Sequence, residues 1–294
     1  MRDAGRGGAS LIELLVAVAV AAVLTGLTLA GVQRVRAAAA RARCADQLRQ
    51  LALGLHQHHD GHGRLPAGVS YDNGAHPQPH MTWLTRLLPH VEQGELWRRS
   101  VAAFEAERFF ERPPHLPILG HKVDLFVCGT DAVGRRPWAF PEFTVAYTSY
   151  LGVTGTDLNA WDGVLHTDAA VPLRGVTDGT SSTLAVGERP AADRRNFGWW
   201  YAGWGQVKTG SADSILGVRE RREGGNLSDC PPGPYHFRPG RADDGCDVLR
   251  FWSNHPGGAN FAFCDGSVRF LPYSADGILP ALATRAGGEV AAPD

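Results

Sequence analysis

The longest uninterrupted apolar segment of the chain lies near its N-terminus. No side chain from Leu14 to Val32 is charged, and Glu13 stands immediately before this run. A helix rises about 1.5 Å per residue, so about 20 such residues cross the roughly 30 Å hydrocarbon core of a bilayer. A secretory signal would have a shorter apolar region followed by a small-residue cleavage site. The pattern therefore predicts a membrane-spanning helix that stays on the mature protein.

Apolar residues keep a helical spacing beyond this segment. They recur at intervals of four, three and four residues, which places them in one stripe on a helix that continues to about Asp60. The stripe consists of Cys44, Leu48, Leu51 and Leu55. A stripe this narrow must be covered, and the downstream domain is the nearest partner. We expect one helix of roughly 50 residues, half in lipid and half packed on a soluble domain.

The pattern changes twice after this helix. Residues 81–93 have the spacing of a short amphipathic helix interrupted at Pro89, and a second helix is expected up to Phe110. Beyond Pro113, runs of β-branched and aromatic residues between turn residues predict strands. We expect these strands at residues 123–128, 144–153, 183–186, 197–204 and 260–271. The last range contains two alternating runs on either side of Asp265-Gly266, which is a strong hairpin signal.

Glu13 is an acid at the edge of an apolar helix. A carboxylate placed deep in the bilayer costs roughly 2.5 to 3.5 kcal/mol, so such a residue by default has a partner and a function. The alternative is a plain anchor whose acid reaches back to the interface. The pattern of residues leaves both interpretations open.

The sequence from Gly8 to Glu13, GASLIE, resembles the type IV prepilin signature. In that family a prepilin peptidase cuts after the glycine and methylates the new amino terminus. The resemblance implies cleavage between Gly8 and Ala9, and it implies that Glu13 pairs with the terminal amine of a neighbouring subunit during assembly. Most family members have phenylalanine at the position of Ala9, so the chain departs from the pattern there.

Blocks further along the chain are similar to those of a large bacterial prepilin-like family whose domain has no known function. These blocks are residues 44–53, 83–93, 177–183 and 187–188. The closing signature of that family is a histidine, nine residues and Asp-Gly, which His255 and Asp265-Gly266 match.

The resemblance implies an α+β fold of the pilin-like type, in which a long N-terminal transmembrane helix packs on a C-terminal domain rich in antiparallel β-sheet. The expected organisation is a prepilin leader at residues 1–8, a long helix at 9–62 and an exported sheet-rich domain at 63–294. The helix is expected to span the membrane at about residues 11–32.

Composition narrows the class of partners. The formal net charge of −1 argues against a nucleic-acid protein, because phosphate binding needs a concentrated basic face. The arginines between Arg34 and Arg49 are better explained as a solvated face or as contacts to lipid headgroups. The expected partners are membrane lipid, the prepilin peptidase and other pilin-like subunits.

Five cysteines show neither a C-x-x-C pair nor zinc-finger spacing, so we expect disulfides in an exported domain and no thiolate metal site. Cys230 and Cys246 bracket a loop rich in Pro and Gly, and closing it would contribute roughly 3 kcal/mol. Cys44 and Cys128 are the second predicted pair, and Cys264 is expected as a buried thiol in a strand.

Three groups of residues invite a chemical interpretation, and a structural one is favoured for each. His56, His59 and His62 have a spacing that metal sites use, but Gly61 is expected to end the helix first. Residues 178–183 have oxygen ligands suited to calcium, the one cofactor considered, although Asp-Gly with Thr is ordinary turn chemistry. If the aromatic residues of segment 197–204 were exposed, they would suit contact with a sugar or a protein. We favour the alternative that they are buried in the core.

Ser253, His255 and Asp265 contain the residue types of a nucleophilic triad. A triad is defined by geometry, however, and the glycine context of a strained nucleophile is missing. We expect instead that His255 and Asp265 brace the base of the last hairpin, where adjacent glycines allow a tight turn.

The sequence therefore predicts a non-enzymatic, pseudopilin-like protein of a type II secretion or type IV pilus-like apparatus. It would be anchored once in the cytoplasmic membrane, with its C-terminal domain outside. The count of arginines flanking the apolar segment opposes this orientation, because Arg34, Arg36, Arg41 and Arg43 outnumber those of the leader. The alternatives are a membrane-tethered receptor for glycans or exported proteins and, less favoured, a metal-dependent hydrolase.

Overall fold

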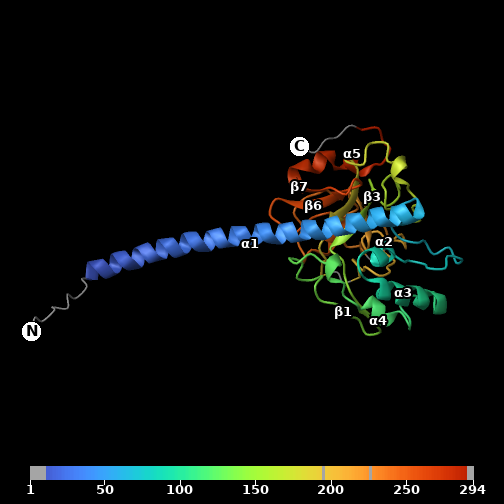
Figure 1. Cartoon of the computed structure of the whole chain (residues 1–294), viewed down its shortest axis with the longest axis horizontal. Helices are drawn as coiled ribbons and strands as arrows, with labels where there is room; N and C mark the ends of the chain where they lie inside the picture. Colours follow the sequence, from blue (N-terminus) through green and yellow to red (C-terminus); the bar gives the residue numbers. More distant parts are fainter. Residues whose placement is uncertain (1–10, 194–195, 225–226, 290–294) are drawn as a thin grey trace, which may run out of the picture. The chain divides into compact units, whose positions relative to one another are not determined.

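The computed structural model of the chain describes residues 11–193, 196–224 and 227–289. The chain forms two compact units, Met1–Ala42 and Arg43–Asp294, and each is described by itself. Helix α1, Leu11–His62, contributes to both (Figure 1).

The first unit contains the apolar part of α1. An 18-residue stretch of this helix has a mean hydropathy of 2.4, and none of it is buried within the protein. Its two hydroxyl residues are satisfied internally, because Thr25 Oγ1 donates to the carbonyl of Ala21 at 2.7 Å and Thr28 Oγ1 donates to that of Leu24 at 3.0 Å. An apolar solvent requires this internal pairing of polar groups. The helix is long and apolar enough to cross a membrane, as the sequence indicates.

The second part of α1 belongs to the folded domain. The predicted stripe is buried, since Cys44, Leu48 and Leu51 have no exposed surface and Leu55 is 3 % exposed. The helix ends where Gly63 adopts a φ of +72° and its N–H bonds to the carbonyl of His59, an arrangement that favours glycine. The expectation that the preceding glycine would end the helix before His62 is wrong.

Short helices follow α1 and end near the cysteine at position 128. They are α2 (Trp83–Leu87), η1 (Leu88–His90), α3 (Gly94–Ala106), α4 (Leu116–Leu119) and η2 (Asp124–Phe126). The hydroxyl of Thr82 caps α2 by accepting from the N–H of Thr85 at 3.3 Å. The two helices predicted between residues 81 and 110 are present, whereas the strand predicted at 123–128 is a 3-10 turn.

A five-stranded sheet forms the centre of the domain, with strand order β5-β3-β4-β6-β7. The strands are β3 (Tyr150–Gly155), β4 (Leu184–Glu188), β5 (Ile215–Gly217), β6 (Gly258–Phe263) and β7 (Val268–Pro272). Strand β5 is parallel to β3, and the other neighbours are antiparallel. A separate pair, β1 (Trp138–Ala139) and β2 (Thr144–Val145), is antiparallel. The structure confirms the α+β class with a sheet rich in antiparallel pairs.

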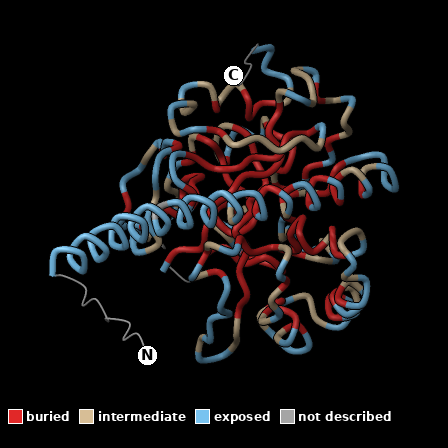
Figure 2. The backbone as a smooth tube through the Cα atoms, turned by 60° about the vertical axis from the view of Figure 1, so that its left-hand side comes forward, coloured by how far each residue is buried: buried red, intermediate tan, exposed pale blue. Residues whose placement is uncertain are grey.

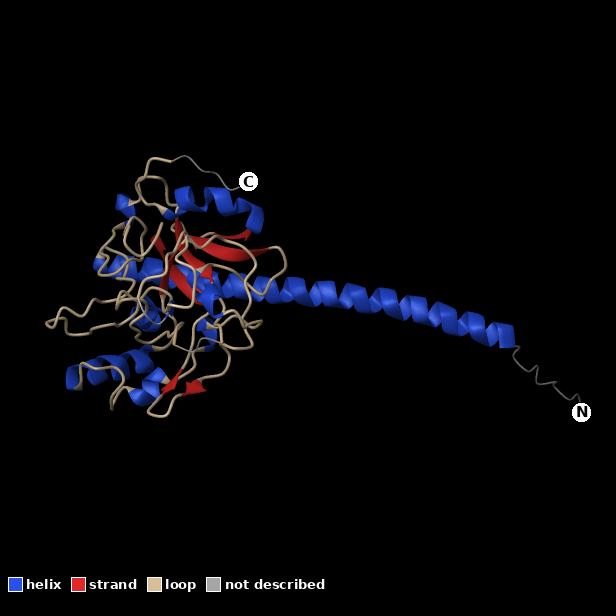
Figure 3. Ribbon diagram, turned by 180° about the vertical axis from the view of Figure 1, so that it is seen from behind, coloured by secondary structure: helices blue, strands red, loops and turns tan. Residues whose placement is uncertain are grey.

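Both faces of the central sheet are covered. Tyr150, Val186 and Ala262 share one core with the buried stripe of α1. On the other face, Leu151 and Phe261 share a second core with residues of α5 (Leu279–Ala283). Figure 2 shows a buried region at the centre of the domain, and Figure 3 shows α5 on one side of the sheet and β1 and β2 on the other.

The aromatic segment at residues 197–204 is not a strand. It consists of bends held by isolated bridges, such as Tyr147 with Trp199. Trp199, Trp200 and Tyr201 are all buried, whereas Trp204 is 38 % exposed. The segment is core, as favoured, but it lacks the alternation that a strand would impose. The remaining short elements are η3 (Leu173–Gly175), η5 (Gly245–Leu249) and η6 (Tyr273–Ile278).

Replacing Leu51 by alanine is expected to destabilise the domain by about 2 to 5 kcal/mol, because it leaves a cavity between α1 and the sheet. The matched control is Leu53→Ala on the same helix, where the side chain is 58 % exposed and the expected change stays within about 0.5 kcal/mol. Urea unfolding of the full chain in detergent, followed by tryptophan fluorescence, measures both. Equal effects of the two substitutions would contradict the packing described.

Candidate functional site

The residues expected to direct processing and assembly lie at the start of the chain. Gly8 and Ala9 are outside the described residues. Glu13 lies in the first turn of α1 and is exposed. Its carboxylate thus stands directly before the uncharged run that starts at Leu14.

The Asp-Gly of the closing signature forms the turn of the last hairpin. Gly266 has a φ of +86°, and Asp265 Oδ1 accepts from the N–H of Ser267 at 2.8 Å. Strand β6 leads into this turn and β7 leaves it, as the sequence predicts. The positive φ explains the glycine, because side chains with a Cβ rarely adopt it.

His255 lies at the opposite end of β6 from this turn. The six residues of that strand separate it from Asp265 by about 20 Å. The hydroxyl of Ser253 donates to the carbonyl of Gly258 at 2.7 Å and accepts from the N–H of His255 at 2.9 Å, so it stabilises a local turn. The expectation that His255 and Asp265 together brace the hairpin is wrong, and Ser253, His255 and Asp265 do not form a triad.

His255 is instead part of a buried centre built from four distant segments. Its Nε2 atom lies 3.4 Å from Glu188 Oε1 and 3.6 Å from Cys128 Sγ. Cys128 forms a disulfide with Cys44. None of the four residues is more than 4 % exposed. One potential ligand atom from each residue lies within 4.8 Å of the others, and the two sulfurs would become metal donors only when the disulfide is reduced.

Secondary structure places each member of the centre. Cys44 lies on the buried stripe of α1, and Cys128 follows η2. Glu188 is the last residue of β4, and His255 precedes β6. Sequence reasoning did not assign a function to Glu188. The available signal was an acidic residue that ends the apolar run from Leu184.

A second layer of polar groups orients the centre. Asn260 donates to both carboxylate oxygens of Glu188, from its backbone N at 2.7 Å and from Nδ2 at 3.0 Å. Thr130 Oγ1 lies 3.1 Å from Cys128 Sγ, and the hydroxyl of Ser149 accepts from the N–H of Cys128 at 3.1 Å. These contacts compensate for part of the cost of burying a carboxylate.

The cysteines pair as the sequence predicts. The structure contains disulfides between Cys44 and Cys128 and between Cys230 and Cys246. Cys264 is a buried free thiol whose pKa is raised by burial. A thiol held in this protonated form is a poor nucleophile and metal ligand.

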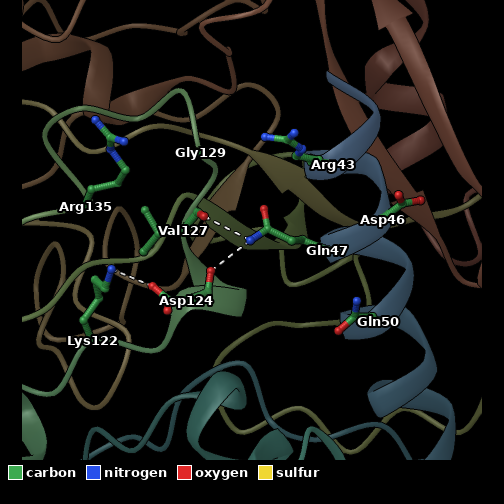
Figure 4. A pocket seen from close by; sticks show the side chains of 9 residues that line it. All are labelled: Arg43, Asp46, Gln47, Gln50, Lys122, Asp124, Val127, Gly129 and Arg135. Carbon is green, nitrogen blue, oxygen red and sulfur yellow. Dashed lines mark hydrogen bonds and ion pairs between the residues drawn. The ribbon is translucent and has the colours of Figure 1, made fainter. Parts of the chain in front are cut away.

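A surface pocket of about 410 Å³ lies between α1 and the segment from Lys122 to Arg135 (Figure 4). Its lining includes residues on both sides of each cysteine in the sequence. The lining residues are Arg43, Asp46, Gln47, Gln50, Lys122, Asp124, Val127, Gly129 and Arg135.

Gln47 joins the two walls of this pocket. Its Nε2 donates to the carbonyls of Asp124 at 2.8 Å and Val127 at 3.1 Å, as Figure 4 shows. The hydroxyl of Tyr150 donates to Gln47 Oε1 at 2.7 Å. Burial raises the pKa of Tyr150 well above its usual range, so this hydroxyl remains a donor. Gln47 therefore fixes the segment before Cys128 to α1.

The histidines near the end of α1 do not converge as their spacing suggested. His59 Nε2 accepts from the N–H of Leu173 at 3.2 Å, and His56 approaches the turn at Gly266. His62 instead stacks on His58, with ring centroids 4.2 Å apart. Burial lowers the pKa of His58 to about 4, which keeps this ring neutral at pH 7. The cluster has the structure of a packed helix end.

The acidic turn at residues 178–183 holds the C-terminal segment. Asp178 accepts from the N–H groups of Gly287 at 2.7 Å and Gly288 at 2.9 Å. Gly179 adopts a φ of +97°, as turn chemistry favours. The carboxylate considered as a calcium ligand is thus directed at backbone donors.

The aromatic segment borders a second pocket, of about 210 Å³. Phe140, Phe143, Trp199 and Trp204 line it together with the buried carboxylate of Asp213. Burial raises the pKa of Asp213 to about 7, while backbone N–H donors and the nearby Arg189 oppose this shift.

Comparison with known proteins places most of the chain in one family. Residues 33–277 match the family described as a protein of unknown function, DUF1559. No curated protein and no solved structure matches the chain. The matched residues begin beyond the apolar segment of α1 and include all four members of the buried centre. This chain belongs to the DUF1559 family.

Proposed function

We propose that the protein is a non-enzymatic, pseudopilin-like component of a type II secretion or type IV pilus-like assembly. The observation that carries the proposal is the division of α1. Its first part is apolar and unburied, whereas its second part forms one wall of the domain core. A single continuous helix thus joins a segment suited to lipid with a folded domain, which is the arrangement the prepilin resemblance implies.

The two disulfides support placement of the domain outside the cytoplasm. Disulfides persist in oxidising compartments and are rare in the cytosol. The family match and the apolar helix are compatible with a membrane-anchored extracytoplasmic protein. We therefore give the disulfides more weight than the arginines that follow the apolar segment.

Assembly would take place through the apolar part of α1. Leu11, Ile12 and Leu14 are each more than half exposed, so this surface is available to lipid or to other helices. Glu13 lies among them in the first turn. In the proposed assembly, the carboxylate of Glu13 neutralises the amino terminus that prepilin peptidase frees on a neighbouring copy, and both charges are then compensated in the bilayer.

A membrane-tethered binding module is the second candidate. The pocket formed by Phe140, Phe143, Trp199 and Trp204 offers aromatic faces and an acidic group, which suit a glycan or a protein ligand. Trp204 is the residue to test, because at 38 % exposure it is the most accessible of the three aromatic side chains Trp199, Trp200 and Trp204.

Processing after Gly8 predicts a mature chain that begins with N-methylated Ala9. Mass spectrometry of the N-terminal peptide from protein isolated from native membranes measures it. Gly8→Val should leave the leader attached, because a branched side chain replaces the small residue before the cut. Wild-type protein that still begins at Met1 would exclude this processing.

The assembly role of Glu13 predicts that Glu13→Ala is cleaved normally but no longer co-assembles with other subunits. Glu13→Asp, which keeps the charge, serves as the matched variant and should retain part of the assembly. Cross-linking between two differently tagged copies in native membranes provides the measurement. Normal cross-linking of Glu13→Ala would refute the pairing of Glu13 with a neighbour.

The binding-module candidate predicts that Trp204→Ala weakens ligand binding on a glycan array by about 2 kcal/mol or more, as for a central aromatic contact. Trp161→Ala is the control, because this residue is 51 % exposed and does not line the pocket. A protein that remains monomeric and binds a glycan through Trp204 would favour this candidate over assembly. If the wild-type protein binds no glycan on the array, the hypothesis that it is a glycan-binding module is excluded.

A further inference from the structure

We propose that the buried centre is a redox-controlled zinc site. When the Cys44–Cys128 disulfide is reduced, the two thiolates, His255 and Glu188 bind one Zn²⁺ ion, and oxidation to the disulfide releases it. The sequence alone argued against a thiolate metal site because the cysteines lie far apart in the chain. This inference concerns the domain itself and is independent of the proposed assembly function.

The spacing of the ligand atoms supports tetrahedral coordination. Zinc bonds of about 2.0 to 2.3 Å place neighbouring ligand atoms roughly 3.3 to 3.8 Å apart. Two of these edges already exist, because His255 Nε2 lies 3.4 Å from Glu188 Oε1 and 3.6 Å from Cys128 Sγ. The ligand atom of Cys44 belongs to the same group, within 4.8 Å of the others. Reduction frees the sulfurs to separate to the distance that zinc requires.

The donor set matches the chemistry of zinc. Thiolate, imidazole and carboxylate are its usual protein ligands, and four of them fill a closed structural site. All four residues are buried, so the ion would be shielded from water. The positive ion would also compensate the charges of Glu188 and of two thiolates, which are costly in this interior when unpaired.

Polar neighbours are already placed to orient the ligands. Asn260 donates to both oxygens of Glu188, and the hydroxyl of Thr130 lies 3.1 Å from Cys128 Sγ. Such partners fix ligand orientation in metal sites, and their loss typically weakens metal binding about 10- to 100-fold. These hydrogen bonds hold Glu188 and Cys128 in fixed orientations within the centre.

The redox step balances with a dithiol as reductant. Two electrons and two protons from the dithiol break the Cys44–Cys128 bond and give two thiols, while the dithiol becomes its own disulfide. Zinc binding then displaces the thiol protons. An oxidant of the disulfide class reverses the first step, removes both sulfur ligands and releases the ion.

A surface pocket lies beside the chain segments that carry the two cysteines. Its lining residues Arg43 and Gln47 flank Cys44 in the sequence, and Val127 and Gly129 flank Cys128. A pocket of about 410 Å³ admits a small dithiol or a hydrated ion. Gln47 holds the segment before Cys128 against α1 through hydrogen bonds that do not involve the disulfide.

The test uses the full chain in detergent with Cys230→Ser and Cys246→Ser, so that one disulfide remains. The protein is reduced with a phosphine, freed of reductant and given Zn²⁺, and bound metal is counted after gel filtration. We expect one equivalent in the reduced protein and none in the oxidised protein. Cobalt substitution should give a thiolate charge-transfer band in the reduced form.

Variants separate coordination from simple packing. Glu188→Gln and His255→Asn should each weaken zinc binding ~10-fold or more, and Cys44→Ser with Cys128→Ser should abolish it. Cys264→Ala removes a buried cysteine that is not among the four ligands and should leave binding unchanged. Near-ultraviolet circular dichroism checks that each variant is folded.

The comparison of reduced with oxidised protein requires no substitution within the centre, so it decides the proposal even if a variant fails to fold. Failure of the reduced, folded protein to retain zinc would overturn the proposal. Retention of zinc by the oxidised protein would do so as well. Unchanged affinity in folded Glu188→Gln and His255→Asn would show that the histidine and carboxylate only fill the core.

Discussion

The packing of the second part of α1 on the sheet is the interaction on which the rest of the domain depends. The residues of its buried stripe share one core with β3, β4 and β6, and Cys44 in that stripe is also covalently joined to Cys128. Loss of this contact would expose the part of that face that α1 covers and would separate Cys44 from Glu188 and His255. The same helix therefore determines both the stability of the domain and the geometry of its buried centre.

A sheet covered on both faces has consequences for the sequence of its strands. β4 and β6 are nearly continuous apolar runs because each strand contributes residues to both cores. Leu184 and Phe261 belong to one core, and Val186 and Ala262 belong to the other. Glu188 ends one of these runs, where a carboxylate can be buried only if donors meet it. Asn260 on the neighbouring strand supplies two of them. Because both faces of the sheet are covered, the polar end of β4 at Glu188 is enclosed and not exposed to solvent.

The pattern of apolar and turn residues predicted the elements whose formation depends mainly on neighbouring residues in the sequence. The stripe of α1 and the β6–β7 hairpin follow from periodicity and from the backbone that Asp265-Gly266 favours, and both are present. The segments at 123–128 and 197–204 have aromatic and β-branched residues typical of strands, yet tertiary packing holds them as turns and bends. The disulfide between Cys44 and Cys128 was predicted. Glu188 and His255 lie next to it because β4 and β6 are neighbours in the sheet, and the distances between residues along the sequence do not reveal this pairing of strands.

The partners of Glu188 distinguish it from other buried carboxylates in the described part of the chain. Asp131 accepts from two backbone N–H groups and a hydroxyl, and Glu220 from three backbone N–H groups and a hydroxyl. These are fixed donors, which suit a permanent structural role. Glu188 contacts, besides Asn260, the imidazole of His255, and this imidazole lies 3.6 Å from a disulfide sulfur that can be reduced to a thiolate. Reduction of that disulfide would place two thiolates beside the carboxylate, and in the proposed zinc site a divalent ion offsets these buried charges.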